Sequence, residues 1–380
     1  MSDLRVLDLT DGSALYAARL LSDLGADVVR LEASGEPRPD ASYRFFNAGK
    51  RSVVVNLDLA AGSDVLTRLC AAAHVVIDGM TPRLDDDTSR VYARCRAGNP
   101  MLVWVAVRPF AQGAGAAFTG TASIVRYALS GLMSITGRAE QAPLLAGGGL
   151  SDAIVAVYGA LACLLGSRLA RLTGEGRLIW VHGHEALSSI MQQGLYEAAL
   201  SGRPVARRGS RHAHIAMAGA LPCRDGYVVI SANERRMWTA LVDLVGDERL
   251  LDPALAEEQS RLARQDDLFE IVGAWTRKFT KAELSQLAQA RGIPVAPVHS
   301  VEDLPDDPQL RARGFFQRVG DDEMPVLRVP WTQRPFPAPF PGEHTAEVLR
   351  EAGFSRDDIG RLEAAGVVAT GSTRQARAMA

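Results

Sequence analysis

The chain has 380 residues, 47% of them hydrophobic and 23% charged, and a formal net charge of −2. A chain of this size and composition can bury a large core, and we expect it to divide into two domains. Its near-zero charge gives no general attraction for nucleic acid or an anionic membrane, so an anionic ligand requires a local basic cluster. We therefore expect small-molecule ligands, with neither nucleic acid nor a membrane as a partner.

The cysteines and the first residues favour a cytoplasmic protein. The four cysteines lie far apart in the sequence and have no spacing typical of a metal or redox site. The segment MSDLRVLDLT runs directly into a predicted strand and lacks the basic and apolar regions of a signal peptide. No apolar stretch reaches about 18 residues without a charge, which disfavours a membrane span.

Strands and helices alternate in the first third of the chain. Residues 4–10 are predicted as a strand, 14–26 as a helix and 27–33 as a second strand. The alternation continues with a helix and three further strands, at 60–73, 51–58, 74–80 and 99–107. This pattern predicts a doubly wound α/β fold, in which helices cover both faces of a parallel sheet.

The later part of the chain is more helical and contains a second unit. Three helices and one strand are predicted at 121–137, 152–172, 184–202 and 177–183. A small α+β domain is expected from two strands and a helix, at 225–232, 293–300 and 235–247. The predicted organisation is a large domain, a linker, the small domain and a return to the large domain, at 1–203, 204–224, 225–325 and 326–380.

Several common sites are disfavoured. The first strand-to-helix turn holds only Gly12 and lacks the GxGxxG of a dinucleotide site. His182 with His184, and His212 with His214, form HxH pairs, but no third metal ligand has suitable spacing. There is no GxSxG segment and no cysteine in an activating context. We expect neither a metal nor a permanently bound cofactor.

A basic segment, FFNAGKRSVVV, is a candidate anion site. It places Lys50 and Arg51 at the start of a strand, after Asn47 and Gly49, which suits backbone and cation contacts to a phosphate. Solvated charges at the end of a strand explain the segment equally well. Three further arginines would join the cluster if the fold brings them together: Arg38, Arg44 and Arg108.

The stretch GGGLSDAIVAVYGALACLL places an acid between glycines and a long apolar helix. Ser151 or Asp152 would suit an N-cap, which is worth about 1 kcal/mol. A carboxylate at a helix N-terminus is also held ionised by the amides and the helix dipole, as a nucleophile requires. Gly147, Gly148 and Gly149 would let a substrate approach the backbone and expose amides to an oxyanion. Capping and catalysis both remain open on these residues alone.

The motifs, taken together, resemble the family III CoA-transferases, which include formyl-CoA transferase, carnitine CoA-transferase and α-methylacyl-CoA racemase. The resemblance runs in order over essentially the whole chain. It is carried by VLDLT and YAARLLSDLGADVVRLE, FNAGKRSVVVNLD, YALSGLMSITG, SDAIVAVYGALACLL with TGEGR, GSRH with DGYVVIS, and GEHTAEVLREAGFS with IGRLEAAGVV.

The resemblance implies a Rossmann-like large domain built from both ends of the chain, a small domain, and two protomers interlocked like chain links. The family's nucleophile, the aspartate before the long apolar helix, falls on Asp152. In the implied reaction, Asp152 attacks the donor thioester and forms a mixed anhydride and free CoA thiolate. The thiolate returns to give an aspartyl-CoA thioester, from which the acceptor carboxylate takes the CoA.

The resemblance also implies the binding residues. Lys50 and Arg51, in the family's GKRS motif, would bind the phosphates of CoA. The other implied CoA contacts are Arg38, Asn47, Asp78, Gly79, Met80, Arg108 and Gln112. The substrate loop would comprise Gly147, Gly148, Gly149 and His212.

The chain departs from the family pattern in several loops. Ala48 replaces an arginine before GKRS, and the segments 13–15, 78–82 and 110–115 differ from the family's AGP, ENFRPG and FGQTGP. TAS replaces the family's GYD or GHD, so Ala122 stands where the racemases carry a proton-transferring histidine. The prediction is a CoA-transferase; the alternatives are a racemase-type enzyme and a catalytically silent CoA-binding protein.

Overall fold

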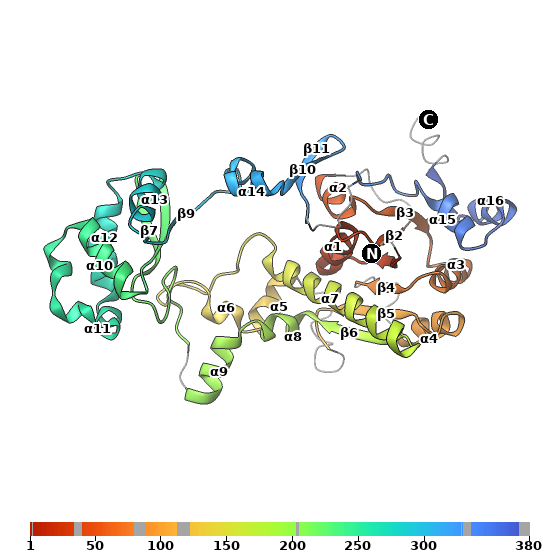
Figure 1. The fold of residues 1–380 in the computed structure, drawn as a ribbon. Coiled ribbons are helices and arrows are strands. Elements are labelled where there is room, and N and C mark those ends of the chain that lie inside the picture. Colours follow the sequence, from red (N-terminus) through yellow and green to blue (C-terminus); the bar gives the residue numbers. More distant parts are fainter. Residues whose placement is uncertain are drawn as a thin grey trace. The chain divides into compact units, whose positions relative to one another are not determined.

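The structure is a computed structural model that describes residues 1, 3–33, 40–79, 88–111, 122–202, 205–327, 329 and 336–371, with the backbone alone at 192 and 193. The chain divides into two compact units (Figure 1). The first unit comprises Met1–Met133, Leu145–Tyr196 and Gln309–Ala380, and the second comprises Ser134–Leu144 and Glu197–Pro308. Each unit is therefore built from segments that are distant in the sequence.

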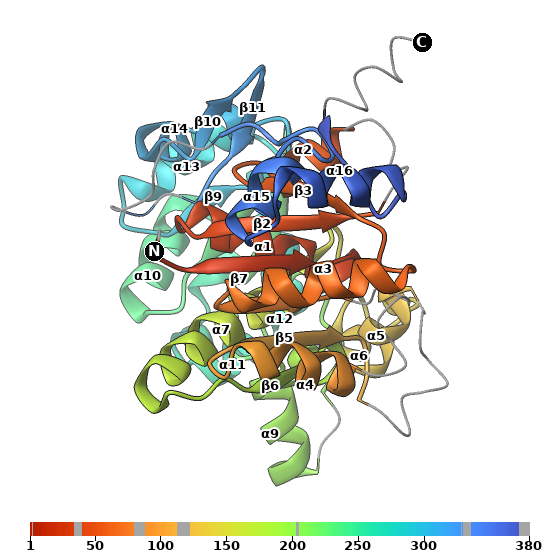
Figure 2. The same cartoon turned by 90° about the vertical axis from the view of Figure 1, so that its right-hand side faces the viewer.

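The first unit contains a seven-stranded sheet in the order β12-β3-β2-β1-β4-β5-β6. All neighbouring strands are parallel except β12, which pairs antiparallel with β3. In Figure 2, β3, β2, β5 and β6 follow one another from top to bottom. The strands are β1 Arg5–Leu9, β2 Asp27–Glu32, β3 Arg51–Val55, β4 Val75–Asp78, β5 Val103–Arg108, β6 Leu178–His182 and β12 Val368–Ala369.

The strand order changes direction between β1 and β4, as it does in doubly wound sheets. Such sheets bind ligands at this point, outside the carboxyl ends of the strands.

The side chains of the strands alternate between two separate hydrophobic cores, one on each face of the sheet. Val6 packs on one face with the helices α1 (Leu15–Asp23) and α7 (Leu150–Thr173). Leu7 packs on the other face, with α3 Ala60–Ala71, α4 Thr88–Gly98, α15 Thr345–Glu351 and α16 Arg356–Ala364. The predicted parallel sheet with helices on both faces is confirmed.

Helix α7 approaches the sheet closely because it carries glycines on its inner face. A Cβ atom at Gly166 would lie 2.7 Å from Ile179 Cδ1 and 2.8 Å from Val103 Cγ1, and one at Gly159 would lie 3.3 Å from Val107 Cγ2. The buried side chains of this face pack against β4, β5 and β6. Glycine is therefore required where the helix crosses the strands.

The opposite face of α7 is apolar and exposed. Its exposed side chains recur at helical spacing: Val157, Leu161, Leu165, Leu169 and Leu172. Within the described part of the chain, α7 is the one helix long and apolar enough to cross a membrane by length and composition. A core helix of a soluble protein meets the same criterion, and α7 has such a buried face, so this is weak evidence for a span.

The predicted helix at 121–137 is interrupted. The structure has α5 (Ser123–Leu129) and α6 (Leu132–Ile135), separated at Gly131, whose φ of 89° lies in the left-handed region that favours glycine. The predicted helix at 184–202 is likewise two helices. The shorter elements outside the second unit's core are η1 Gly12–Ala14, α2 Ala41–Asn47, α8 Gly183–Ser189, α9 Gln192–Ser201, α14 Pro308–Arg313, β10 Phe316–Val319 and β11 Asp322–Pro325.

The second unit is built on a three-stranded antiparallel sheet in the order β7-β8-β9. Its own core joins this sheet to the surrounding helices through buried residues such as Leu241, Leu268 and Ile230. The elements are β7 Ala218–Cys223, β8 Gly226–Ser231, α10 Arg235–Val245, η3 Glu248–Leu251, η4 Pro253–Ala256, α11 Glu258–Ala263, α12 Gln265–Thr276, α13 Lys281–Gln289, β9 Val295–Pro297 and η5 Leu304–Asp306.

The segment Ser134–Leu144 belongs to the second unit, and Arg207 of that unit forms hydrogen bonds with it. The guanidinium of Arg207 donates hydrogen bonds to the carbonyls of Arg138, Ala139 and Gln141, at 3.0, 3.1 and 3.0 Å. A bridge also joins Arg138 to Arg208. The domain boundary predicted near residue 204 therefore lies inside a region that contacts an earlier part of the chain.

Candidate active site

Asp152 lies in the first turn of α7. Gly149 is the N-cap residue, and no side chain caps the helix. Gly148 and Gly149 have φ values of 69° and 67°, in the left-handed region, and the N–H of Asp152 donates to the carbonyl of Gly149 at 3.0 Å. The interpretation of Ser151 or Asp152 as the cap of this helix is therefore wrong, and the carboxylate of Asp152 is left for another role.

That carboxylate pairs with Arg126 from α5. The Nη2 atom of Arg126 donates to Oδ1 of Asp152. The two partners differ in exposure, because the Asp152 side chain is 41% exposed and the Arg126 side chain only 5%. The helix dipole adds to the stabilisation of a negative charge at this position. The site thus presents a solvent-accessible carboxylate on a buried cation.

The side chain of Arg126 packs against Gly183. A Cβ atom at Gly183, the first residue of α8, would lie 2.6 Å from Arg126 Cδ and 3.0 Å from its Nε. The Nε atom is buried and has no hydrogen-bond partner within the described residues. Gly183 therefore makes room for the arginine, and one of its donors remains available.

Arg126 is not among the site residues predicted from the sequence. The available signal was a charge inside the otherwise apolar segment SIVRYALSG, within the region predicted as a helix. A buried arginine in such a position needs an anionic or polar partner. The partner lies 26 residues away in the sequence, and only the packing of α5 on α7 brings them together.

Lys50 is fully buried, directly before β3. Its Nζ donates to Oδ2 of Asp8 at 2.7 Å and to Oδ1 of Asn47 at 3.2 Å. Burial lowers the pKa of Lys50 to about 8, although the charge of Asp8 opposes this shift. Burial alone would raise the pKa of Asp8, but Lys50 and Arg30 hold it below its ordinary value. In this structure the ammonium is thus satisfied by carboxylate and amide oxygens of its own chain.

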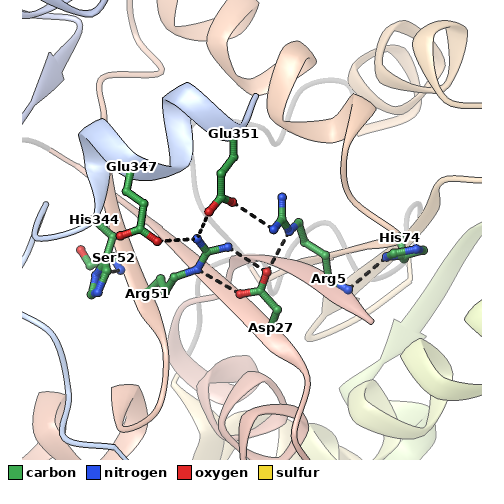
Figure 3. Close-up of polar contacts among 8 residues, drawn as sticks. All are labelled: Arg5, Asp27, Arg51, Ser52, His74, His344, Glu347 and Glu351. Atoms are coloured by element: carbon green, nitrogen blue, oxygen red, sulfur yellow. Dashed lines mark hydrogen bonds and ion pairs between the residues drawn. The ribbon is translucent and has the colours of Figure 1, made fainter. Parts of the chain in front are cut away.

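Arg51, the first residue of β3, is also held by carboxylates (Figure 3). Its guanidinium donates to both oxygens of Asp27, at 3.0 and 2.8 Å. It also donates to Glu347 and Glu351 of α15, at 3.2 and 2.9 Å, and Arg5 joins the network through Asp27 and Glu351. Arg51 therefore joins helix α15 to the amino end of β3.

A third group gathers at the carboxyl ends of β4 and β5. Arg108 Nη2 donates to Oδ2 of Asp78 at 2.7 Å, and Trp104 Nε1 donates to the same oxygen at 3.2 Å. A Cβ atom at Gly79 would lie 2.5 Å from the backbone nitrogen of Asp11, so only glycine fits there. Asp78, Gly79 and Arg108, predicted as CoA contacts, are thus brought together at the edge where doubly wound sheets bind ligands.

The remaining predicted contacts are distributed differently. Lys50 and Arg51 stand at the amino end of β3, whereas Asp78 and Arg108 end their strands, so the structure does not gather them into one group. Arg44 pairs with Asp322 at 2.7 Å. Three predicted contacts lie outside the described residues: Arg38, Met80 and Gln112.

A pocket of about 790 Å³ adjoins the GKRS segment in the first unit. Lys50 and Arg51 line it on one side, and a late part of the chain lines the other, including Phe336, Phe340 and His344. A pocket of this size is typical of small-molecule sites.

Gly147 and the two glycines after it are exposed, and a Cβ atom at any of them would meet no atom within 4 Å. His212 lies in the second unit, where its Nδ1 accepts from the N–H of His214 at 3.1 Å. Within the described residues, no group of three His, Cys, Asp or Glu side chains could hold a metal ion.

Comparisons with known proteins identify the family. The sequence profile of CoA-transferase family III matches residues 1–345. The chain is 29% identical to a succinate–glutarate CoA-transferase of Agrobacterium fabrum, covering 92% of this chain and 95% of that protein. It is 30% identical to a succinyl-CoA:mesaconate CoA-transferase of Haloarcula marismortui, covering 93% and 96%. It is 27% identical to a formyl-CoA:oxalate CoA-transferase of Streptomyces coelicolor, covering 97% and 99%.

Solved structures agree with the fold. A protein of Brucella suis described as a CAIB/BAIF family protein superposes with a TM-score of 0.83 at 24% identity, covering 92% of this chain and 98% of that one. Because a family profile matches far more than half of the chain, the relationship does not depend on fold similarity alone. The chain belongs to CoA-transferase family III.

Proposed function

We propose that this CoA-transferase moves CoA from an acyl-CoA donor to a free carboxylic acid, with Asp152 as the nucleophile. The observation that carries the proposal is the position of Asp152: a carboxylate 41% exposed on the first turn of α7, after three exposed glycines and against a buried arginine. A carboxylate nucleophile must be both ionised and accessible, and this position favours both properties.

The reaction proceeds in covalent steps. A carboxylate oxygen of Asp152 attacks the thioester carbonyl of the donor and expels CoA thiolate, which leaves a mixed anhydride. The thiolate then attacks the aspartyl carbonyl, giving an aspartyl-CoA thioester and releasing the donor acid. The acceptor carboxylate repeats the two steps in reverse and leaves as the new acyl-CoA. Covalent catalysis divides one difficult exchange into these easier steps.

The amides of the glycine loop suit the oxyanions of these steps. Gly147, Gly148 and Gly149 have no side chains and lie in open space, and two residues separate Gly149 from Asp152. Backbone N–H groups in such a position can stabilise the negative charge that develops on a carbonyl oxygen. His212, which the family resemblance assigns to the substrate loop, remains a proposed substrate contact.

The proposed CoA contacts remain the predicted ones, in two separate groups that lie at opposite ends of their strands. The pocket beside Lys50 and Arg51 has room for part of the nucleotide, and Asp78, Gly79 and Arg108 stand at the carboxyl edge of the sheet. Because Lys50 and Arg51 already hold carboxylates, phosphate binding by either would require exchange of these contacts. Arg38, Met80, Gln112 and Asn47 complete the proposed set.

The proposed donor is succinyl-CoA, and the proposed acceptor is a dicarboxylic acid. The relatives from Agrobacterium and Haloarcula carry succinate or succinyl-CoA in their names, together with glutarate or mesaconate. Racemase activity is not proposed, because Ala122 cannot transfer a proton.

A cytoplasmic homodimer of interlocked protomers is part of the proposal. The exposed apolar stripe of α7, from Val157 to Leu172, supports an interface, because monomeric proteins rarely expose contiguous apolar surface of this kind. In a dimer this stripe would be buried. Size-exclusion chromatography with light scattering should give the mass of two chains, 2 × 40.7 kDa, and the mass of one chain would contradict it.

Trapping tests the nucleophile. The purified protein is incubated with succinyl-CoA and hydroxylamine, which converts an aspartyl anhydride or thioester into a hydroxamate. Peptide mass spectrometry should find the hydroxamate at Asp152, and an Asp152→Asn variant should show none. Full transferase activity in that variant would disprove the mechanism.

A further inference from the structure

We propose that Arg126 binds the carboxylate of the acceptor acid while Asp152 is held as its CoA thioester. This inference rests on the proposed function, since it assigns a substrate contact within that reaction. It names a site for the reacting carboxylate that the family resemblance did not supply.

In the resting structure, the Arg126 guanidinium and the Asp152 carboxylate neutralise each other. The Arg126 side chain is 5% exposed, and its Nη2 donates to Oδ1 of Asp152. No second carboxylate contacts Arg126 within the described residues. Asp152 is therefore the counterion that neutralises Arg126.

Acylation of Asp152 removes that counterion. An anhydride or a thioester carries no negative charge, so Arg126 is left as a buried cation without its partner. Removing the charge of one partner in a buried ion pair is strongly unfavourable, because the charge that remains is poorly solvated. An incoming carboxylate can restore the pair, and a planar guanidinium suits a carboxylate particularly well because it offers parallel donors.

The geometry leaves a donor for this ligand. The Nε atom of Arg126 is buried and unpartnered within the described part of the chain. Gly183 packs against the arginine at Cδ and Nε, so this end of the side chain is held in place. The pair with Asp152 already shows that a carboxylate oxygen fits beside Nη2. A carboxylate on Arg126 therefore lies next to the aspartyl carbonyl that it must attack.

The chemical steps balance. An oxygen of the acceptor carboxylate attacks the aspartyl thioester carbonyl and breaks its bond to sulfur, which leaves a mixed anhydride and CoA thiolate. The thiolate attacks the acceptor's acyl carbonyl and breaks its bond to the aspartyl oxygen. New acyl-CoA forms and the Asp152 carboxylate returns to Arg126. Arg126 thus pairs with the acceptor carboxylate before the exchange and with the Asp152 carboxylate after it.

The test separates the two halves of the reaction. Succinyl-CoA with hydroxylamine measures acylation of Asp152, and transfer of CoA from succinyl-CoA to isotopically labelled succinate requires an acceptor as well. The variants are Arg126→Met and Arg126→Lys. The matched control is Arg171→Met, which removes an arginine that pairs with Asp3 at 2.8 Å near the other end of α7.

Arg126→Met should lower the rate of trapping, because Asp152 loses its counterion, but the KM for succinyl-CoA should change by at most about threefold while the KM for labelled succinate rises about 10- to 100-fold. Arg126→Lys should recover part of the succinate affinity, and Arg171→Met should match the native protein in both assays. Two results would overturn the inference: an unchanged KM for succinate, or an equal rise for succinyl-CoA and succinate.

Gly183→Ala provides a second, milder variant in case removal of Arg126 prevents folding. The added methyl group displaces the arginine while its charge remains, so the KM for succinate should rise and trapping should persist. Unchanged succinate kinetics in this variant would count against the inference. Absence of trapping in the native protein would instead disprove the proposed function, so the two failures can be distinguished.

Discussion

Two buried cations of the first unit each hold a carboxylate, yet their surroundings differ. Lys50 and Asp8 are both completely buried, and Asn47, Arg30 and Thr10 make further contacts with them. Arg126 is almost as buried as Lys50, but its partner Asp152 is 41% exposed. The side chains of the first pair are not exposed, whereas the carboxylate of the second pair is accessible to solvent. Identical charge pairing thus serves stability in one place and is suited to chemistry in the other.

A sequence motif does not show whether a basic residue is free to bind a ligand. GKRS is typical of an anion site, but Lys50 and Arg51 are already satisfied by acids of their own chain. Arg126 belongs to no motif and retains an unpartnered Nε within the described residues. A basic residue is available to a ligand according to its partners in the fold, and the sequence pattern alone does not reveal them.

The largest expected effect comes from Asp152. Asp152→Asn should lower the rate of CoA transfer at least about 10³-fold, because the nucleophile is lost. The free energy of unfolding should fall by about 1–3 kcal/mol, because Arg126 loses its counterion, although the amide oxygen can still accept its hydrogen bond and Asp152 is partly exposed. Steady-state kinetics and urea unfolding measure the two effects. A large loss of stability with retained activity would reverse the assignment of the two pairs.

Lys50 should show the opposite behaviour. Lys50→Met leaves Asp8 buried without its main counterion and should lower the free energy of unfolding by about 3–5 kcal/mol. Lys281→Met is the matched control, because Lys281 is partly exposed and lies 3.8 Å from Asp303; its loss should cost about 1 kcal/mol or less. Equal unfolding midpoints in urea for the two variants would show that the Lys50 pair is not structural.

The pH dependence sharpens the assignment of Lys50. Its pKa is about 8 in the folded protein, chiefly because of burial, against an ordinary 10.5. Between these two values the unfolded chain binds more protons than the folded chain, so this group makes stability rise with pH. The difference in unfolding free energy between native protein and Lys50→Met should therefore rise by up to about 1.4 kcal/mol per pH unit from pH 8 to pH 10.5. A flat difference would contradict the buried pair.

The glycines before Asp152 should give the smallest effect. Gly149→Ala places a Cβ atom in open space but forces a left-handed φ of 67°, which should cost about 1 kcal/mol of stability. Gly147→Ala is the control, since Gly147 is not among the glycines of positive φ. Thermal unfolding of the two variants compares them. Equal midpoints would mean that the start of α7 does not depend on the left-handed glycine.

The sequence alone was sufficient for the alternation of strands and helices, and therefore for the parallel sheet, because apolar periodicity reflects local backbone geometry. It also placed Asp152 directly before a long apolar helix, and ordered motifs indicated the family. It did not predict the break at Gly131, because the surrounding residues all favour a helix while one left-handed glycine ends it.

Only the tertiary structure decided the partners of the charged residues. Arg51 meets Glu351, 300 residues later in the chain, and Arg126 meets Asp152 through the packing of α5 on α7. Such pairs depend on which distant segments pack together, and this packing cannot be predicted from the local sequence. The charge of Asp152 and its position at the start of a helix made it a candidate nucleophile. Only the packing shows that Asp152 on Arg126 is exposed, whereas Asp8 on Lys50 is buried.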